Sequence, residues 1–328
     1  MGSDCQSGNQ TQDRGIQQLG GVTVKKQDSV KKTKSISSSR ERLSYYLMLM
    51  PFGVLFIMFM ALPVVISIVL SFFSFDTISM PHFIGFQNYL RMFLEDQNFT
   101  VVAKNTLILA IIVGPLGFIL AFVLAWFINE FNPKVRTVLS FMFYCPALVS
   151  NAFYIWQVAF SNDSYGYVNS LLLSMGFITE PINWLKNASY TMPIIIIIQL
   201  WMSMGVSFLA NISGLQNINS EMYEAGAIDG IRNRWQELWY ITLPAMQHML
   251  LFSAVMAISG AFSIGGICVT MAGYPSVENS VDTIVSYLSD VGTVKYEFGY
   301  ACAVSVFLFA VMLIFRYAVG KLLSKTGK

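Results

Sequence analysis

Six long apolar stretches constrain this chain more than any other feature of its sequence. They cover about residues 45–75, 101–128, 138–160, 190–212, 248–271 and 299–320. Each is long enough to cross roughly 30 Å of hydrocarbon as a helix. Hydrophobic residues make up 55% of the chain and charged residues only 12%, whereas a soluble domain carries about 25% charged residues. The sequence therefore predicts an all-α membrane protein with six transmembrane helices.

The distribution of positive charge predicts the orientation of these helices. Of the 20 lysine and arginine residues, sixteen fall in segments 1–44, 129–137 and 213–247 and in the tail that begins at Arg316. If six spans alternate across the membrane, all four segments lie on the same side. The remaining cations lie on the other side or at span edges: Arg91, Lys104, Lys186 and Lys295. Because lysine and arginine are retained on the inner side, we predict a multi-pass protein of the cell (inner or plasma) membrane with both termini cytoplasmic.

Residues 1–42 differ in composition from the rest of the chain. They are polar, basic and rich in glycine, serine and glutamine. Such a segment lacks the apolar side chains that would order it, and no short apolar region with a cleavage site marks it as a signal peptide. We predict a disordered basic cytoplasmic tail over residues 1–42 and a six-helix transmembrane domain over residues 43–328.

The predicted inner loop at about 213–247 is unusually long for a connection between membrane helices. Its apolar residues recur at three- and four-residue spacing, which predicts an amphipathic helix with one apolar stripe. Gly226 and Gly230 would allow another backbone to approach closely, or would allow a break between two short helices. One interpretation is a helix that lies on the membrane surface, but Arg232 and Arg234 are outnumbered by acidic residues, which does not suit anionic lipid.

Several motifs together resemble those of ABC importer permeases. Residues 224–230 read EAGAIDG and residues 241–244 read ITLP, which is similar to the EAA loop of that family with Gly226 in place of the second alanine. Further matches are FIGFQNY at 83–89, KNTL at 104–107, INWL at 182–185 and GYA at 299–301. The pattern is similar to the sugar and glycerol-phosphate branch, and to the first of its two paired permeases. Residues 269–275, VTMAGYP, depart from the family form.

This resemblance implies the type I permease fold of ABC importers and a set of partners. These are a second homologous permease subunit, a cytoplasmic ABC ATPase dimer, an extracellular solute-binding protein and a carbohydrate substrate, within the lipid bilayer and without nucleic acid. An amphipathic helix lying in a groove is a known recognition mode. The residues predicted to couple this chain to the ATPase are Glu224, Ala225, Gly226, Asp229, Gly230, Leu243 and Pro244. Asp229 has an equal alternative as a turn or cap residue before Gly230.

A substrate path is predicted from polar and aromatic residues within the spans. Amides and hydroxyls can hydrogen-bond a sugar, and an aromatic face can lie beneath its ring. The alternative is that such residues pack helices together or sit at the membrane interface. With the family placement included, the candidates are Ser203, Ser207, Phe262 and Ser263, followed by Asn151 and Tyr154. Because no charged residue lies in the middle of a span, a neutral solute is favoured over a charged one.

Three other functions remain as alternatives. The first is import of glycerol-phosphate or another small polar solute, and the second is ion-coupled secondary transport, which the missing intramembrane carboxylates disfavour. The third is an intramembrane serine protease, but the two histidines, His82 and His248, both lie at span edges. The chain has no GxxxxGK[ST] phosphate loop, so ATP is expected on a partner subunit. The four cysteines form no CxxC pair, so we expect neither a metal site nor disulfide chemistry from them. As a transport subunit the chain is expected to carry no cofactor and no catalytic residues.

Overall fold

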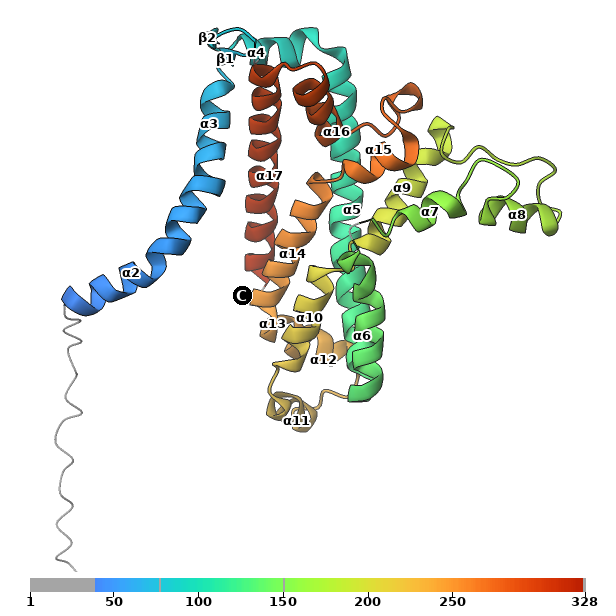
Figure 1. Cartoon of the computed structure of the whole chain (residues 1–328). Helices are drawn as coiled ribbons and strands as arrows, with labels where there is room; N and C mark the ends of the chain where they lie inside the picture. Colours follow the sequence, from blue (N-terminus) through green and yellow to red (C-terminus); the bar gives the residue numbers. More distant parts are fainter. Residues whose placement is uncertain (1–38, 77, 150, 327–328) are drawn as a thin grey trace, which may run out of the picture. The chain divides into compact units, whose positions relative to one another are not determined.

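The computed structural model describes residues 39–76, 78–149 and 151–326, and most of them are helical (Figure 1). The chain divides into two compact units, Met1–Met60 and Ala61–Lys328. The predicted tail over residues 1–42 lies almost entirely outside the described residues and stays a prediction. Its last residues, from Ser39 onward, belong to the first described helix.

The described part of the first unit consists of α2 (Ser39–Phe56), followed by the π-helical segment η1 (Ile57–Ala61), whose last residue begins the second unit. Helix α3 (Leu62–Leu70) follows. Pro63 lies in the first turn of α3, where a missing N–H costs no hydrogen bond. The apolar helical segment Tyr45–Leu70 is long enough to span a bilayer. It is shorter than predicted, because Phe73–Ser74 (β1) leaves the helix and pairs antiparallel with His82–Phe83 (β2).

Helix α5 (Gln97–Asn129) is the central element of the second unit. It packs against α14 (Gln247–Phe262) and α10 (Val206–Gln216), and α14 also packs against α17 (Phe298–Thr326). The side chain of Asp96 caps α5 by accepting the Phe99 N–H at 3.1 Å. Pro115 lies inside α5 without ending it. Buried side chains between these helices form three apolar clusters along the bundle.

Three of the predicted spans are interrupted helices. The third is α6 (Pro133–Leu148) followed by the short α7 (Tyr154–Ala159), the fourth is α9 (Ala188–Met202) followed by α10, and the fifth is α14 followed by α15 (Gly266–Ala272). A Cβ on Gly205 would lie 2.8 Å from Ala147 Cβ, so the fourth span breaks where the end of α6 approaches it.

The structure does not confirm the count of six spans. Among the described residues, four helical segments are long and apolar enough to cross a membrane: Tyr45–Leu70, Gln97–Asn129, Ala188–Gln216 and Phe298–Leu322. A fifth is reached if α14 and the segment before it, which meet at an angle of 82°, count as one span. The predicted third span falls short because α6 has only 16 residues and ends at Leu148, where Val149 adopts an extended conformation.

Short elements cover the end of the bundle opposite the chain's C-terminus (Figure 1). These are α4 (Gln87–Leu90), η2 (Arg91–Glu95), η4 (Val277–Asn279), α16 (Ile284–Ser289) and η5 (Asp290–Val294). Asp96 joins them, because its carboxylate accepts hydrogen bonds from Tyr300, at 2.6 Å, and from Tyr287. Burial raises the pKa of Asp96, but the two hydroxyls and the Phe99 N–H outweigh it, so the pKa lies below its ordinary value of 3.8. Helix α8 (Tyr167–Ser174) extends from the side of the bundle (Figure 1).

Candidate functional site

The predicted coupling loop folds into short helices instead of one. Helix α11 (Ser220–Ile228) begins at Asn219, whose side chain accepts the Glu221 N–H at 3.2 Å. It ends at Gly230, which has φ of +92°, a conformation that glycine adopts without steric cost. Helix α12 (Arg234–Glu237), the π-helical segment η3 (Leu238–Thr242) and α13 (Leu243–Ala245) follow. The structure thus contains the predicted break at Gly230.

The prediction of one continuous apolar stripe is wrong. Leu238 and Ile241 are buried, whereas Ile228, Trp235 and Trp239 are exposed to 88%, 59% and 62%. The turn at Gly230 changes the direction of the chain, so the three- and four-residue spacing does not continue from α11 into the next helix. Leu238 and Ile241 therefore pack onto the bundle, while Ile228, Trp235 and Trp239 remain largely exposed.

Two contacts hold α12 of this loop to α5. Arg234 forms an ion pair with Glu130 at the end of α5, at 2.6 Å, and its orientation is fixed by a second ion pair within α12, to Glu237 at 2.7 Å. The ring of Trp235 lies 5.5 Å from that of Trp126 on α5. These links are separated by more than one hundred residues in sequence, and no local pattern indicated them.

The predicted coupling residues divide into exposed and buried groups. Glu224, Ala225 and Asp229 are exposed on α11, and Asp229 caps the helix with its backbone N–H on the Ala225 carbonyl at 3.0 Å. Gly226 is buried, and a Cβ there would lie 2.6 Å from Ile241 Cδ1. This contact and the Tyr223–Thr242 hydroxyl pair, at 3.1 Å, hold α11 against η3.

The last two predicted coupling residues form the connection from the loop to α14. Leu243 packs onto the cluster that includes Ile212 and Leu250, and Pro244 is exposed beside it. The helix axis then bends by 82° into α14. A displacement of the loop would therefore reach α14 through α13, and α5 through Arg234.

The predicted path residues do not all lie in comparable surroundings. Ser207 is buried, and its hydroxyl donates to the Ser253 carbonyl at 3.1 Å between α10 and α14. Phe262 is also buried, with its ring 5.2 Å from that of Phe315. In the chain as described, these two side chains serve helix packing.

The other four path residues lie at or beside the helix interruptions. Ser203 ends α9, and Ser263 ends α14 and is exposed. Asn151, which is exposed, and Tyr154, which is 49% exposed, lie where α6 gives way to α7. The interruptions are neighbours, because Gln157 of α7 donates to the Thr270 carbonyl of α15 at 3.2 Å and Trp156 of α7 lies 5.6 Å from Trp201 of α9. Interrupted helices commonly form the substrate sites of membrane transporters.

The motifs outside the coupling loop have structural roles that their sequence did not reveal. The Asn105 amide donates to the carbonyls of Asn279 and Asp282, at 2.7 and 3.1 Å, and the Ile284 N–H donates to Thr106 Oγ1 at 2.8 Å. Asn88 donates to the carbonyls of Ser71 and Phe73. These side chains fix the loops at the end of the bundle opposite the coupling loop. In the sequence, only the family motifs marked Asn88, Asn105 and Thr106. Their hydrogen-bond partners could not be predicted, because each is a backbone group at a distant position in the chain.

A comparison with known protein families supports a transporter subunit. Residues 114–325 match the model of the binding-protein-dependent transport system inner membrane component. The chain belongs to this family. Members are subunits of transporters and not enzymes, and the chain is a permease of the multi-pass cell-membrane type, as the sequence predicted. Among the described residues, no group of three or more His, Cys, Asp or Glu side chains is placed to hold a metal ion.

Individual relatives agree with this assignment. The arabinooligosaccharides transport system permease protein AraP of Bacillus subtilis is 30% identical over 82% of this chain and 85% of that protein. The lactose transport system permease protein LacF of Rhizobium radiobacter is 29% identical over 86% of this chain and 96% of that protein. A subunit in the crystal structure of a bacterial ABC transporter involved in import of the acidic polysaccharide alginate superposes with a TM-score of 0.73 at 25% identity, over 88% of this chain and 98% of that chain. The permease fold of ABC importers is therefore shared.

Proposed function

We propose that this permease is one of two paired transmembrane subunits of an ATP-driven importer of a sugar or oligosaccharide. The observation that carries the proposal is the coupling loop. Its α11 surface is exposed, and the loop is held to α5 by the Arg234–Glu130 ion pair and by packing of Trp235 on Trp126. Family membership supports it, as do the carbohydrates named for AraP and LacF. A second crystal structure of the alginate transporter contains an alginate pentasaccharide-bound periplasmic protein, which supports delivery by a separate solute-binding protein.

In this proposal the cytoplasmic ATPase binds and hydrolyses ATP, and this chain converts the movement of the ATPase into helix movement. Glu224, Ala225 and Asp229 present the outer side of α11 to the ATPase surface. Because Arg234 and Trp235 join the loop to α5, and Pro244 leads into α14, a shift of α11 moves these central helices as a unit. Such rigid-body rocking is a common mode of alternating access.

The orientation belongs to the same proposal. Both termini and the loop at 213–247 lie on the cytoplasmic side, and six helical passes cross the membrane when the interrupted α6–α7 segment counts as one of them. Sixteen of the 20 lysine and arginine residues then lie inside, as the retention of cations requires.

The substrate path is proposed to run along the helix interruptions. Asn151, Tyr154, Ser203 and Ser263 offer amide, phenol and hydroxyl groups there, while Ser207 and Phe262 support the helices behind them. Hydroxyl groups of a neutral carbohydrate would exchange hydrogen bonds with these side chains. None of these six side chains is a carboxylate or a basic group that would neutralise a charged solute.

The test is a charge reversal on α11. Glu224→Lys permease, expressed with its paired permease and ATPase, is expected to insert at the normal level but to lose uptake and substrate-stimulated ATP hydrolysis. Glu180→Lys is a matched control, because Glu180 is also exposed but lies in the outer loop between the third and fourth predicted spans.

Unchanged uptake by the Glu224→Lys complex would contradict the coupling role. Loss of uptake with both variants would show that charge reversal acts through insertion or folding, and would also remove support for the coupling role. The lone chain in liposomes should show no uptake. Uptake by the lone chain without an ATPase would indicate a secondary carrier.

A further inference from the structure

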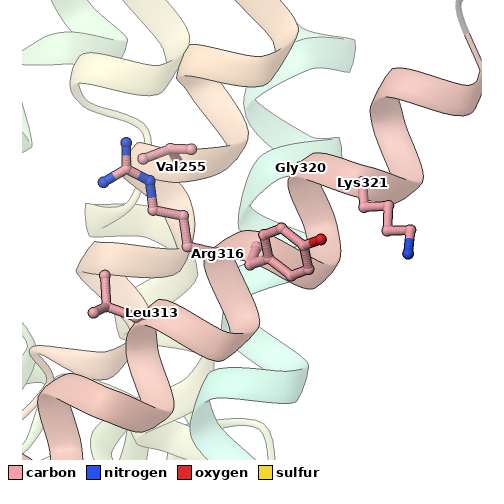
Figure 2. A pocket seen from close by; sticks show the side chains of 6 residues that line it. Val255, Leu313, Arg316, Gly320 and Lys321 are labelled. Atoms are coloured by element: carbon pink, nitrogen blue, oxygen red, sulfur yellow. The ribbon is translucent and has the colours of Figure 1, made fainter.

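A groove on the side of the bundle lies apart from the coupling loop and from the points at which the helices are interrupted. It has a volume of about 590 Å³ and is lined by Val255 of α14 and by Leu313, Arg316, Tyr317, Gly320 and Lys321 of α17. The α17 residues recur at three- and four-residue spacing, so they form one face of that helix. Figure 2 shows Arg316 reaching from α17 toward Val255 on α14.

The groove lies at one end of a membrane-spanning helix. Arg316 and Lys321 are near the C-terminal end of the span Phe298–Leu322, and this end of α17 is the end of the bundle where α13 and the coupling loop also lie (Figure 1). Long basic side chains near the end of a span extend toward the membrane interface, where lipid headgroups lie. None of the ion pairs found among the described residues involves Arg316.

The two cations and their surroundings match one class of ligand. A guanidinium donates two parallel hydrogen bonds to a phosphate, and an ammonium adds a compact positive charge. Tyr317, which is 72% exposed, offers a hydroxyl beside them, while Val255 and the 42% exposed Leu313 form an apolar wall toward the interior of the membrane. A ligand that fits both parts carries a phosphodiester and a hydrocarbon chain. Basic pockets between membrane helices are known sites for anionic lipid headgroups.

The geometry points to a binding site for an anionic phospholipid at this groove, with its phosphodiester on Arg316 and Lys321 and an acyl chain along Val255 and Leu313. With the orientation given under the proposed function, the lipid lies in the inner leaflet. The binding itself does not depend on that orientation. Occupation would hold α17 against α14, which is one of the two helices that the coupling loop is proposed to move.

The test measures lipid binding to the purified full-length chain, independently of transport. Its melting temperature is titrated with phosphatidylglycerol, with phosphatidylcholine of the same acyl chains, and with glycerol phosphate, which has the anionic group but no acyl chain. We expect stabilisation by phosphatidylglycerol only. Arg316→Gln/Lys321→Gln should weaken the apparent affinity for phosphatidylglycerol by roughly tenfold or more, since each cation near an anionic surface contributes about fivefold.

Two further variants separate lipid binding from general effects of charge. Lys134→Gln/Arg136→Gln removes the same net charge at the start of α6, outside the groove, and should leave the affinity within twofold. Gly320→Leu tests the shape of the groove, because a Cβ at Gly320 meets no atom within 4 Å and the larger side chain fills the groove without changing charge. This variant should fold as the wild type does and bind phosphatidylglycerol several-fold more weakly.

Several outcomes would overturn the inference. Equal stabilisation of the wild type and the Arg316→Gln/Lys321→Gln variant, or equal loss in the control pair, would mean that the groove is not the site. Binding of glycerol phosphate as tight as that of phosphatidylglycerol would mean a site for free anions. In the assembled transporter, a photo-crosslinker at position 317 should yield lipid adducts, and adducts to the paired permease would assign the groove to the subunit interface instead.

Discussion

Substitution of Gly299 by alanine tests how the first residues of α17 are held. A Cβ on Gly299 would lie 2.1 Å from the Phe73 carbonyl oxygen and 3.0 Å from the Phe75 nitrogen, both of them backbone atoms that cannot rotate away. The Gly299 N–H also donates to the Phe75 carbonyl at 3.0 Å. The clash would push the β1 strand away from α17, and overpacking of this kind costs about 1–3 kcal/mol of unfolding free energy.

Helix propensity acts in the opposite direction. Alanine in place of glycine favours a helix by up to about 1 kcal/mol, so a variant without a clash should be neutral or stabilised. Gly260 in α14 is the matched control, because a Cβ there meets nothing within 4 Å. Because the propensity gain is common to both variants and cancels when they are compared, we expect Gly299→Ala to be less stable than Gly260→Ala by the cost of the clash, about 1–3 kcal/mol.

The assay is thermal unfolding of the purified full-length chain, followed by tryptophan fluorescence. The Gly299→Ala variant should melt several degrees below the wild type, and the Gly260→Ala variant at or above it, since about 1 kcal/mol corresponds to roughly 2–4 °C for chains of 150–250 residues. If Gly299→Ala melts at the wild-type temperature or higher, the close approach of α17 to the β1 strand does not constrain the fold, and the reasoning is refuted.

Three more predictions concern buried polar groups. Asn169→Leu should destabilise segment 160–187 by about 3 kcal/mol or more, seen as faster proteolysis there, because the buried amide bonds the Ile182 N–H, the Trp184 indole and three carbonyls; an unchanged cleavage rate would contradict this. Asn211→Leu should raise the melting temperature, because both polar atoms of the buried Asn211 side chain lack a hydrogen-bond partner among the described residues and such atoms cost about 1–3 kcal/mol; a lower melting temperature would show that the amide is satisfied. Asp96→Asn should remove a pH-dependent stabilisation, because the folded-state pKa of Asp96 lies below 3.8. The unfolding free energy of the wild type should exceed that of the variant above about pH 4, and the two should converge as the pH falls through the folded-state pKa. A difference that stays constant down to that pH would show that the ionised carboxylate is not the hydrogen-bonded form.

The local structure of the loop at 213–247 was accessible from the sequence, while its coupling role stays a prediction. Its short helices and its turn were indicated because its glycines and its Asp-Gly pair act locally. Gly230 ends α11 whatever lies around it, since the left-handed conformation favours glycine. The apolar spacing misled at the same point, because periodicity assumes one helix axis and the turn at Gly230 starts a second one.

For the predicted substrate path, the sequence identified polar residues within the spans. It could not distinguish side chains available to a substrate from side chains that pack one helix against another. Ser203 and Ser207 are four residues apart and chemically identical, yet Ser203 lies at a helix interruption and Ser207 lies against Ser253 in a buried contact. Only the approach of α14 makes this difference. The interruption itself depends on a neighbour, because Gly205 is placed against Ala147.

The sequence by itself determined the membrane environment and the position of the long loop at 213–247, because apolar length, charge bias and glycine conformation are properties of short segments. Its motifs were enough to indicate the permease family. The tertiary structure alone decided which helices are interrupted, how Arg234 ties the loop to Glu130, and how Asp96 joins Tyr287 and Tyr300. Those features depend on side chains far apart in the chain that meet only when the helices pack, and no pattern within a short segment specifies such a meeting.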